Sequence, residues 1–127
     1  MDIYKKKITV TEDHIDGLNH VNNVIYLQWV QDIAVEHWNS KTSESLNAEY
    51  MWMVVDHFIK YKKQAFQGDE LTVETYVSSN RAATSERHVK FYRGSELLVE
   101  AKTTWCLLDR KSGRPKRVTE EIQSLFQ

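Results

Sequence analysis

Residues 16–29 read Asp-Gly-Leu-Asn-His-Val-Asn-Asn-Val-Ile-Tyr-Leu-Gln-Trp, and this stretch decides the fold. Polar side chains crowd the loop around its beginning: Asp13, His14, Asp16, Asn19, His20, Asn22 and Asn23. The residues that follow contain no Pro or Gly and are apolar on almost every side: Val24, Ile25, Tyr26, Leu27, Trp29, Val30, Ile33 and Ala34. A helix that is apolar all round is a buried helix. The stretch therefore predicts a polar loop leading into a buried helix that ends near residues 38–40.

The beginning of this helix is the first candidate for a reactive position. Asn22 or Asn23 is expected to cap it. The first turn of any helix carries N–H groups without intrahelical partners and the positive end of the helix dipole. Such an end stabilises an oxyanion or a polarised carbonyl. The helix has one consistent polar stripe, Gln28, Asp32 and Glu36, which we expect to face solvent or a partner subunit.

Length and composition exclude several classes of protein. The 127 residues suffice for one domain with one core, and 41% apolar and 28% charged residues are typical of a globular chain. A formal net charge of −1 provides no field for nucleic acid, and the single cysteine, Cys106, excludes an internal disulfide and a multi-cysteine metal site. The N-terminus lacks the apolar run of a signal peptide, and no stretch approaches the ~18 apolar residues of a membrane span. We expect one cytoplasmic domain, residues 1–127, without metal or cofactor.

Beyond the helix the apolar period changes to two, which indicates strands. The predicted strands are residues 3–10, 52–66, 70–78, 86–93 and 96–108, with a loop or short helix at 41–50, a polar connection at 78–85 and a short C-terminal helix at 118–126 capped by Thr119. Gly68-Asp69 is typical of a hairpin turn. We expect all four glycines, including Gly17 in the polar loop, where φ is positive or the backbone approaches closely.

The predicted order is one strand, one buried helix and four antiparallel strands, an α+β architecture. A single helix that is apolar all round is covered only if the sheet curls around it. One sheet still leaves part of the helix open, so a second subunit is expected.

This organisation resembles the hotdog fold, specifically the acyl-CoA thioesterase group that includes 4-hydroxybenzoyl-CoA thioesterase. The resemblance rests on Asp16, His20-Val-Asn-Asn23, Tyr26 and Trp29, with further likeness over residues 66–74, 100–104 and 109–115. The element Asp-x-x-x-His-Val-Asn-Asn-x-x-Tyr is also similar to that of plant acyl-ACP thioesterases. The resemblance implies a curved antiparallel sheet wrapped around one long central helix, in a homodimer or homotetramer.

The resemblance also implies roles for the loop residues. Asp16 falls on the catalytic carboxylate, as nucleophile or as general base on water, and the backbone N–H of Asn23 falls on the group that polarises the thioester carbonyl. His20 and Asn22 match positions that shape the site and hold water. On residue pattern alone, the same side chains are a turn residue, a loop histidine and helix caps.

Substrate contacts are assigned in the same way, because the phosphates of coenzyme A must meet cations. The candidates are Tyr26, Lys62, Lys63, Arg81 and Ser85, although pattern alone places Tyr26 in the core. The chain departs from the family at two positions: Asn19 stands where many members have Gly, and Gln31 stands where many have Glu.

The predicted function is therefore an acyl-CoA thioesterase that hydrolyses an acyl thioester to a free acid and a thiol. One backbone donor at the developing oxyanion is worth ~3 kcal/mol, and a thiolate leaves with little acid assistance. A hotdog hydratase or dehydratase and a non-catalytic acyl-thioester binding module are the alternatives. The pattern leaves open the acyl chain and the choice between coenzyme A and acyl carrier protein.

Overall fold

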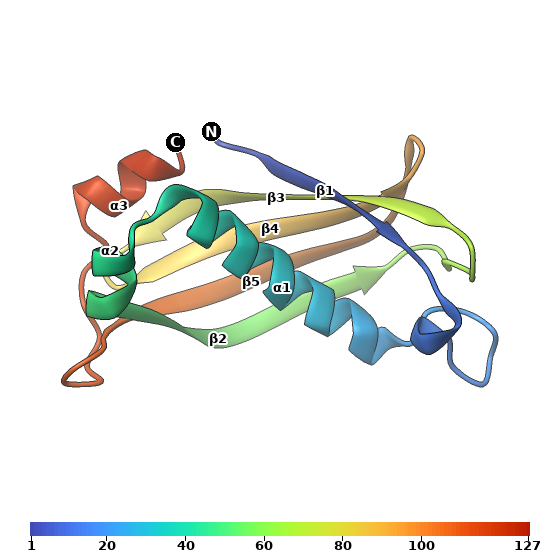
Figure 1. The fold of residues 1–127 in the computed structure, drawn as a ribbon, viewed down its shortest axis with the longest axis horizontal. Helices are drawn as coiled ribbons and strands as arrows, with labels where there is room; N and C mark the ends of the chain where they lie inside the picture. The colour runs from blue at the N-terminus through green and yellow to red at the C-terminus, as the bar shows by residue number, and fades with distance from the viewer.

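A computed structural model describes residues 1–127 as a five-stranded antiparallel sheet curled around one long helix (Figure 1). The strands are β1 (Tyr4–Thr9), β2 (Tyr50–Tyr61), β3 (Glu70–Arg81), β4 (Thr84–Arg93) and β5 (Glu96–Asp109), and their order in the sheet is β1-β3-β4-β5-β2. The helices are α1 (Asn23–Lys41), α2 (Glu44–Glu49) and α3 (Glu120–Leu125), with a 3-10 turn η1 (Glu12–His14) before α1. The predicted α+β architecture is confirmed.

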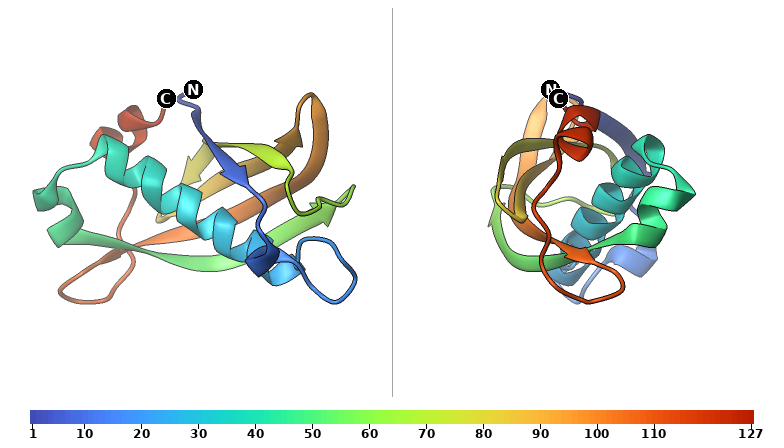
Figure 2. Two further views of the ribbon diagram at one scale, coloured as in Figure 1. Left: turned by 45° about the vertical axis from the view of Figure 1, so that its right-hand side comes forward. Right: turned by 90° about the vertical axis from the view of Figure 1, so that its left-hand side faces the viewer.

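Helix α1 lies along the concave face of the sheet, which wraps around it when viewed end-on (Figure 2). Its inward side chains Val30 and Ile33 are fully buried against strand residues such as Phe91. Each such side chain contributes ~1.5–3 kcal/mol when it leaves water. The opposite side of α1 stays open, because Val24 is 66% and Val35 is 51% exposed. The exposed stripe is therefore wider than the predicted polar one, and a single sheet does not cover the helix.

Alternation along the strands places one set of side chains on α1. On β5 the predicted inward face, residues 97, 99, 101, 103, 105 and 107, is buried or half-buried throughout. On β3 and β4 the same alternation also buries two polar side chains, Thr75 and Arg87, with 0% and 6% exposure. The alternation along β4 therefore buries the guanidinium of Arg87 in the interior, on the same face as Val89 and Phe91.

Two predicted connections are wrong. Residues 78–85 continue β3 and β4 as a ladder, with Asn80 opposite Ser85 and Arg81 opposite Thr84, because backbone pairing does not require apolar side chains. The turn at Gly68 does not close a hairpin either. Strand β2 ends at Tyr61 and pairs with β5, whereas β3 pairs with β1 and β4, so the connection crosses from one side of the sheet to the other.

The positive-φ positions agree with the sequence at Gly68, Gly94 and Gly113. Gly17 is the exception, since its φ is not positive and nothing lies within 4 Å of where a Cβ would stand. In this loop Asn19 adopts the left-handed conformation instead, with φ of 66°. Asparagine tolerates this region better than most residues, so the Gly-to-Asn departure from the family keeps the turn.

The two termini meet at the end of the barrel-like sheet where α3 packs (Figures 1 and 2). The N–H of Asp2 donates to the carbonyl of Phe126 over 3.2 Å. As predicted, Thr119 caps α3, and its hydroxyl accepts from the N–H of Ile122 at 3.2 Å. None of the helices has the length and apolar character needed to cross a membrane.

Candidate active site

The loop between η1 and α1 is closed on itself by backbone hydrogen bonds. Ile15 and Val21 form an antiparallel bridge, and inside it the N–H of Asp16 donates to the carbonyl of His20 over 3.0 Å. The N–H of Asn19 donates to the carbonyl of Asp16 over 3.1 Å. The pinched loop therefore holds Asp16 opposite His20, immediately before the helix begins.

The two carboxylate oxygens of Asp16 have different surroundings. Its Oδ1 accepts a hydrogen bond of 2.9 Å from the N–H of Leu18, which fixes the side chain in a turn. Its Oδ2 has no hydrogen-bond partner in the protein. The side chain is about three-quarters buried, with 26% of its surface exposed. One oxygen thus anchors the carboxylate while the other remains free to accept a proton or to attack a carbon.

His20 lies beside Asp16 without bonding to it. Its Nδ1 is 3.8 Å from Asp16 Oδ1, longer than the ~3.2 Å limit of an ordinary N–H···O bond. The same nitrogen is buried and has no other partner. Burying an unpaired ring nitrogen is unfavourable by ~1–3 kcal/mol. The imidazole is therefore a polar group of this loop whose bonding capacity the protein leaves unused.

The helix start provides a free donor next to this pair. Asn22 is the cap, since its Oδ1 accepts from the N–H of Val24 at 3.0 Å and its carbonyl accepts from the N–H of Ile25 at 2.9 Å. Asn23, the first helical residue, is exposed, and its N–H has no partner. The sequence left the cap open between Asn22 and Asn23, and the structure separates their roles.

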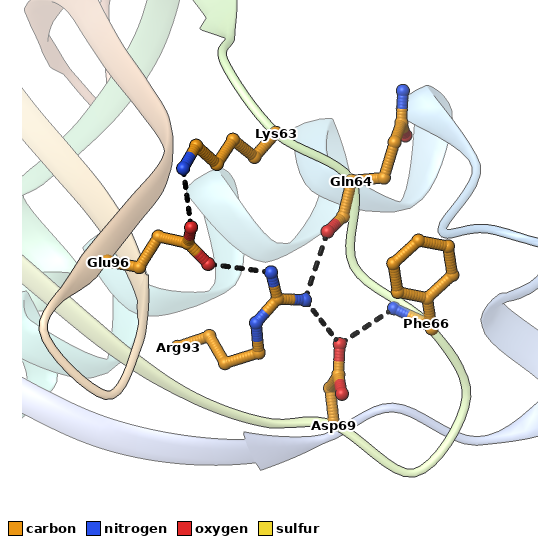
Figure 3. A network of polar contacts seen from close by, with 6 residues as sticks. All are labelled: Lys63, Gln64, Phe66, Asp69, Arg93 and Glu96. Atoms are coloured by element: carbon orange, nitrogen blue, oxygen red, sulfur yellow. Dashed lines mark hydrogen bonds and ion pairs between the residues drawn. The ribbon is translucent and has the colours of Figure 1, made fainter.

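A polar network joins the segment between β2 and β3 to the turn between β4 and β5 (Figure 3). The N–H of Val21 donates to the carbonyl of Ala65 over 3.0 Å, which ties the loop to the segment between β2 and β3. Arg93 clamps that segment, because its Nη1 donates to Asp69 Oδ2 at 2.8 Å and to the Gln64 carbonyl at 3.1 Å. Sequence reasoning placed Arg93 at the end of a predicted strand and gave it no role in the site.

The same guanidinium extends to the β4–β5 turn. Arg93 Nη2 donates to Glu96 Oε1 over 2.7 Å, and Lys63 Nζ donates to Glu96 Oε2 over 2.6 Å. The hydrogen bonds from Lys63 and Arg93 hold the pKa of Glu96 below its ordinary value. The sequence contained a signal for this network. Asp69 and Glu96 are acidic residues beside the two turns, and their carboxylates can accept from one cation between them.

Lys62 and Lys63 lie at the same end of the molecule as the loop. Both backbone N–H groups donate to the carbonyl of Leu98, at 2.8 and 3.0 Å, where β2 ends. Lys62 Nζ is 3.5 Å from Glu100 Oε1. Both lysine side chains remain about half exposed, at 45% and 58%, so they can still meet an anion in solvent.

Arg81 and Ser85 lie at the opposite end. Strand β3 starts beside the loop, where the N–H of Val10 donates to the carbonyl of Asp69 over 2.9 Å, and it ends at Arg81. Twelve strand residues span roughly 35–40 Å. One chain therefore brings together Asp16, His20, Asn22, Asn23, Lys62 and Lys63 but not Arg81 and Ser85.

Tyr26 belongs to the hydrophobic core, as residue pattern alone predicts. It is 3% exposed, and its ring lies edge-on to Trp29 and Phe91 with centroids 5.5 and 5.2 Å away. Its hydroxyl is buried without a partner, and burial raises the pKa of Tyr26 to about 12. The phenol is therefore neutral and places no charge near the loop.

The loop and the helix start together have the parts needed for attack on a carbonyl. A free carboxylate oxygen supplies a base or a nucleophile, and an unpaired N–H at the positive end of a helix dipole supplies a site for a developing oxyanion. Both come from one short, hydrogen-bonded stretch, which the bond from Val21 to Ala65 ties to the segment between β2 and β3.

Known proteins were compared with the chain. The family model of the acyl-ACP thioesterase N-terminal domain matches residues 1–126. The solved YbaW probable thioesterase from Escherichia coli is similar at 20% identity and a TM-score of 0.83, over 95% of this chain and 94% of that chain. A 1,4-dihydroxy-2-naphthoyl-CoA thioesterase from Synechocystis is similar at 16% identity and a TM-score of 0.83, over 98% and 95%.

A thioesterase from Thermus thermophilus, solved with coenzyme A and Zn, is similar at 18% identity and a TM-score of 0.84, over 96% of this chain and 90% of that chain. No curated protein sequence matches the chain. The solved structures share its hotdog fold, a curved antiparallel sheet around one long helix, which confirms the fold predicted from the sequence. Because the family model matches almost the whole chain, the protein belongs to the acyl-ACP thioesterase family of hotdog-fold thioesterases.

Proposed function

We propose that this protein is an acyl-CoA thioesterase that hydrolyses an acyl thioester to a free acid and coenzyme A. Its family supports acyl thioester hydrolysis in general. Coenzyme A is favoured as carrier because one similar structure is named as an acyl-CoA thioesterase and two others were solved with coenzyme A. The observation that carries the proposal is the pairing of a free Asp16 Oδ2 with an unpaired Asn23 N–H on one pinched loop.

In the proposed reaction the carboxylate of Asp16 acts on the thioester at the start of α1. As general base, Asp16 Oδ2 removes a proton from water while the water oxygen bonds to the carbonyl carbon. The carbonyl oxygen becomes negative and accepts from the N–H of Asn23, where one donor contributes ~3 kcal/mol. The C–S bond then breaks and the thiol leaves as thiolate, which the proton held by Asp16 neutralises.

As nucleophile, Asp16 would instead attack the carbonyl carbon itself. The thiolate leaves, and water hydrolyses the mixed anhydride to the acid and regenerated Asp16. His20 serves both routes as the neighbour that orients the carboxylate or water, since its Nδ1 is buried and unpaired 3.8 Å away. Asn22 contributes by capping the helix, which leaves the Asn23 N–H as the free donor.

The proposed substrate contacts divide between two chains. Lys62 and Lys63 lie near the loop and meet phosphates, and Tyr26 supports the acyl side from the core. Arg81 and Ser85 lie at the other end of the sheet, so they reach a loop only from a second protomer. An antiparallel pairing of two β2 strands across a two-fold axis sets the beginning of one β2 beside the end of the other.

The free edge of β2 supports this homodimer. Strand β2 pairs only with β5, so its other edge has unpaired backbone groups, which favour addition of another strand. Large apolar side chains along β2 are exposed: Met53 50%, Val55 53%, Phe58 58% and Tyr61 42%. Val35 on the open side of α1 is also exposed. A tetramer of two such dimers is the alternative assembly.

The test is thiol release from a panel of acyl-CoA substrates by wild-type protein and by Asp16→Asn. Loss of general-base or nucleophilic chemistry is expected to lower kcat/KM at least ~100-fold. Asp13→Asn, at an exposed acidic residue of η1, is the matched control and is expected to retain activity. Unchanged thiol release by Asp16→Asn would show that the catalytic assignment is wrong, whereas saturable substrate binding by the wild-type protein without thiol release would favour a binding module.

A single turnover in H₂¹⁸O distinguishes the two roles of Asp16. A general base places one ¹⁸O directly in the released acid. A nucleophile releases a first acid without solvent label when water attacks the aspartyl carbonyl, and the label then appears on Asp16.

The panel also discriminates the alternatives. Saturated and 2-enoyl-CoA substrates are offered together, and hydration of the enoyl substrate without thiol release would identify a hydratase. Matched acyl groups on coenzyme A and on acyl carrier protein decide the carrier, with faster release from coenzyme A expected.

A further inference from the structure

A hollow lies between the C-terminal half of α1 and the concave sheet, away from the loop at Asp16. Aromatic side chains dominate its wall, and the main lining residues are Trp38, Trp52, Val77, Trp105, Phe126 and Arg87. The hollow opens to solvent, so its volume of about 60 Å³ is not closed at the mouth and a longer apolar body can extend out of it. Along α1, Trp38 is fifteen residues beyond Asn23, which corresponds to roughly 22 Å. Within one chain, the hollow is therefore separate from the free N–H at the helix start.

Arg87 is the single charged residue of this wall, and it has no carboxylate partner. Only 6% of the residue is exposed. Its Nη1 donates to His37 Nδ1 at 2.8 Å and to the hydroxyl of Thr75 at 3.0 Å. Of the five N–H groups of a guanidinium, these bonds use two, and no hydrogen bond in the protein uses Nε or Nη2. A buried cation is unfavourable unless an anion or hydrogen-bond acceptors compensate it.

The adjacent groups do not supply that anion. An arginine only donates, so His37 Nδ1 accepts, and the imidazole proton must sit on Nε2. That proton goes to Asp2 Oδ2, 2.7 Å away. Asp2 also meets Lys41 Nζ at 3.1 Å. A neutral imidazole thus separates the nearest carboxylate from Arg87. Burial lowers the pKa of His37 and lowers that of Arg87 to about 10, in keeping with a desolvated cluster.

Two further polar groups of the hollow are unused. Trp105 Nε1 is buried without a hydrogen-bond partner, and the hydroxyl of Ser85, a residue 7% exposed, makes no hydrogen bond. Both residues line the hollow together with Arg87. The Arg87 guanidinium and the Ser85 hydroxyl therefore border a space whose remaining wall is mostly apolar, with four aromatic side chains. An aromatic wall favours an apolar body, whereas the guanidinium fork fits a carboxylate.

We propose that this hollow binds an apolar carboxylate, with the acid group on Nε and Nη2 of Arg87 and the apolar body among Trp38, Trp52 and Trp105. The Ser85 hydroxyl donates to the same acid group. The carboxylate is either a free acid or the distal carboxylate of an acyl group, and both have the same chemistry at Arg87.

Tryptophan fluorescence measures this binding directly, because three of the four tryptophans line the hollow. Full-length protein is titrated with phenylacetate and octanoate and with the uncharged analogues 2-phenylethanol and octanol. The carboxylates are expected to bind saturably and at least ~10-fold more tightly than the alcohols, since a charge-assisted bond adds ~1.5–3 kcal/mol.

Variants assign the binding to the hollow. Val77→Phe fills the space and retains Arg87, and it is expected to weaken carboxylate binding at least ~10-fold. Arg87→Lys keeps the charge but loses the fork and is expected to weaken it as well. Lys90→Gln, on the same strand but outside this hollow, is the control. Near-ultraviolet circular dichroism verifies that each variant is folded. Equal affinity for acids and alcohols, wild-type binding by Val77→Phe, or no saturable binding would overturn the proposal.

A second arm identifies the source of the carboxylate. Thiol release from a dicarboxylic acyl-CoA and from a monocarboxylic acyl-CoA of equal length is compared in wild-type and Val77→Phe protein. If Val77→Phe lowers thiol release from the dicarboxylic substrate alone, the ligand is the distal acyl carboxylate. If Val77→Phe affects the two substrates equally and the wild-type protein still binds the acids, the ligand is a free acid. The fluorescence titration does not depend on hydrolysis, so failure of the proposed thioesterase activity is separable from failure of this site.

Discussion

His20 Nδ1 lies 3.8 Å from Asp16 Oδ1, in contact but beyond hydrogen-bond distance, although Asp16 and His20 are joined through their backbones at 3.0 Å. We therefore expect the imidazole to orient the carboxylate or a water rather than to share its proton. We expect His20→Gln to lower kcat/KM roughly 10–100-fold through misplacement, less than Asp16→Asn. Steady-state thiol release checks this order. Equal losses in the two variants would contradict an auxiliary role and make His20 part of the proton transfer.

Asn22 is expected to act through the helix it caps. Asn22→Ala removes the acceptor for the N–H of Val24 and should lower the free energy of unfolding by ~1 kcal/mol. Asn22→Asp preserves an acceptor and is expected to restore stability. Thr119→Ala is the matched control, because it removes the equivalent cap of α3 far from the loop. Urea unfolding and thiol release are measured together. A loss of activity in Asn22→Asp at full stability would show that the amide itself contacts substrate or water.

Arg93 is expected to position the segment that supports the loop. Arg93→Met breaks its bonds to Asp69, Gln64 and Glu96 and should lower stability by about 1 kcal/mol, because the pairs are partly exposed. Thiol release should fall by more than the loss of folded protein explains. The reason is that Ala65, in the segment that Arg93 holds, accepts the hydrogen bond from Val21 of the loop.

The control for Arg93 is Lys5→Met, which removes an ion pair of 3.7 Å with Glu74 from the opposite part of the sheet. This variant is expected to change stability by less than ~0.5 kcal/mol and to retain activity. Identical behaviour of Arg93→Met and Lys5→Met in both assays would refute the positioning role.

Acid should destabilise the protein through His37. Burial lowers the pKa of His37 below the ordinary 6.5, so between these values the unfolded chain binds the proton and the folded chain does not. The contribution is complete above about pH 6.5 and is lost as the pH falls. Urea unfolding at pH 7.5, 6.5 and 5.5 should show the decline.

His37→Gln is expected to reduce that pH slope, because an amide can donate to Asp2 and accept from Arg87 without titrating. His57 contributes in the same direction, since burial also lowers its pKa. The double variant His37→Gln, His57→Gln is therefore expected to show a still smaller dependence of the unfolding free energy on pH. An unchanged slope in both variants would mean that other groups govern the acid sensitivity.

The β2 edge is expected to control oligomeric state. Met53→Lys combined with Val55→Lys places two charges along the free edge and should convert the proposed dimer to monomer, which sedimentation velocity measures. Glu12→Lys with Asp13→Lys, exposed at η1, is the control with two added cations. A monomeric wild-type protein would contradict the proposed interface.

The sequence alone determined the features that depend on neighbouring residues. The helix caps at Thr119 and Asn22 and the turn at Gly94 each involve only a few consecutive residues. The alternation along β5 requires only that one face of the strand is buried. The quoted stretch likewise predicted a polar loop before a buried helix. A curled sheet was predictable because one helix apolar on nearly all sides requires such a sheet to cover it, and the resemblance carried by the loop residues implied the hotdog fold.

Tertiary structure decided the contacts between distant segments. Arg87 and His37 are 50 residues apart and meet only because β4 lies under α1. Strands β2 and β3, consecutive in the chain, lie on opposite sides of the sheet, which the turn between them does not reveal. The resemblance assigned Arg81 and Ser85 to the substrate, and the length of the sheet places them at the far end from the loop of their own chain. Sheet order and burial, which depend on the whole chain, govern these placements, and no short stretch contains them.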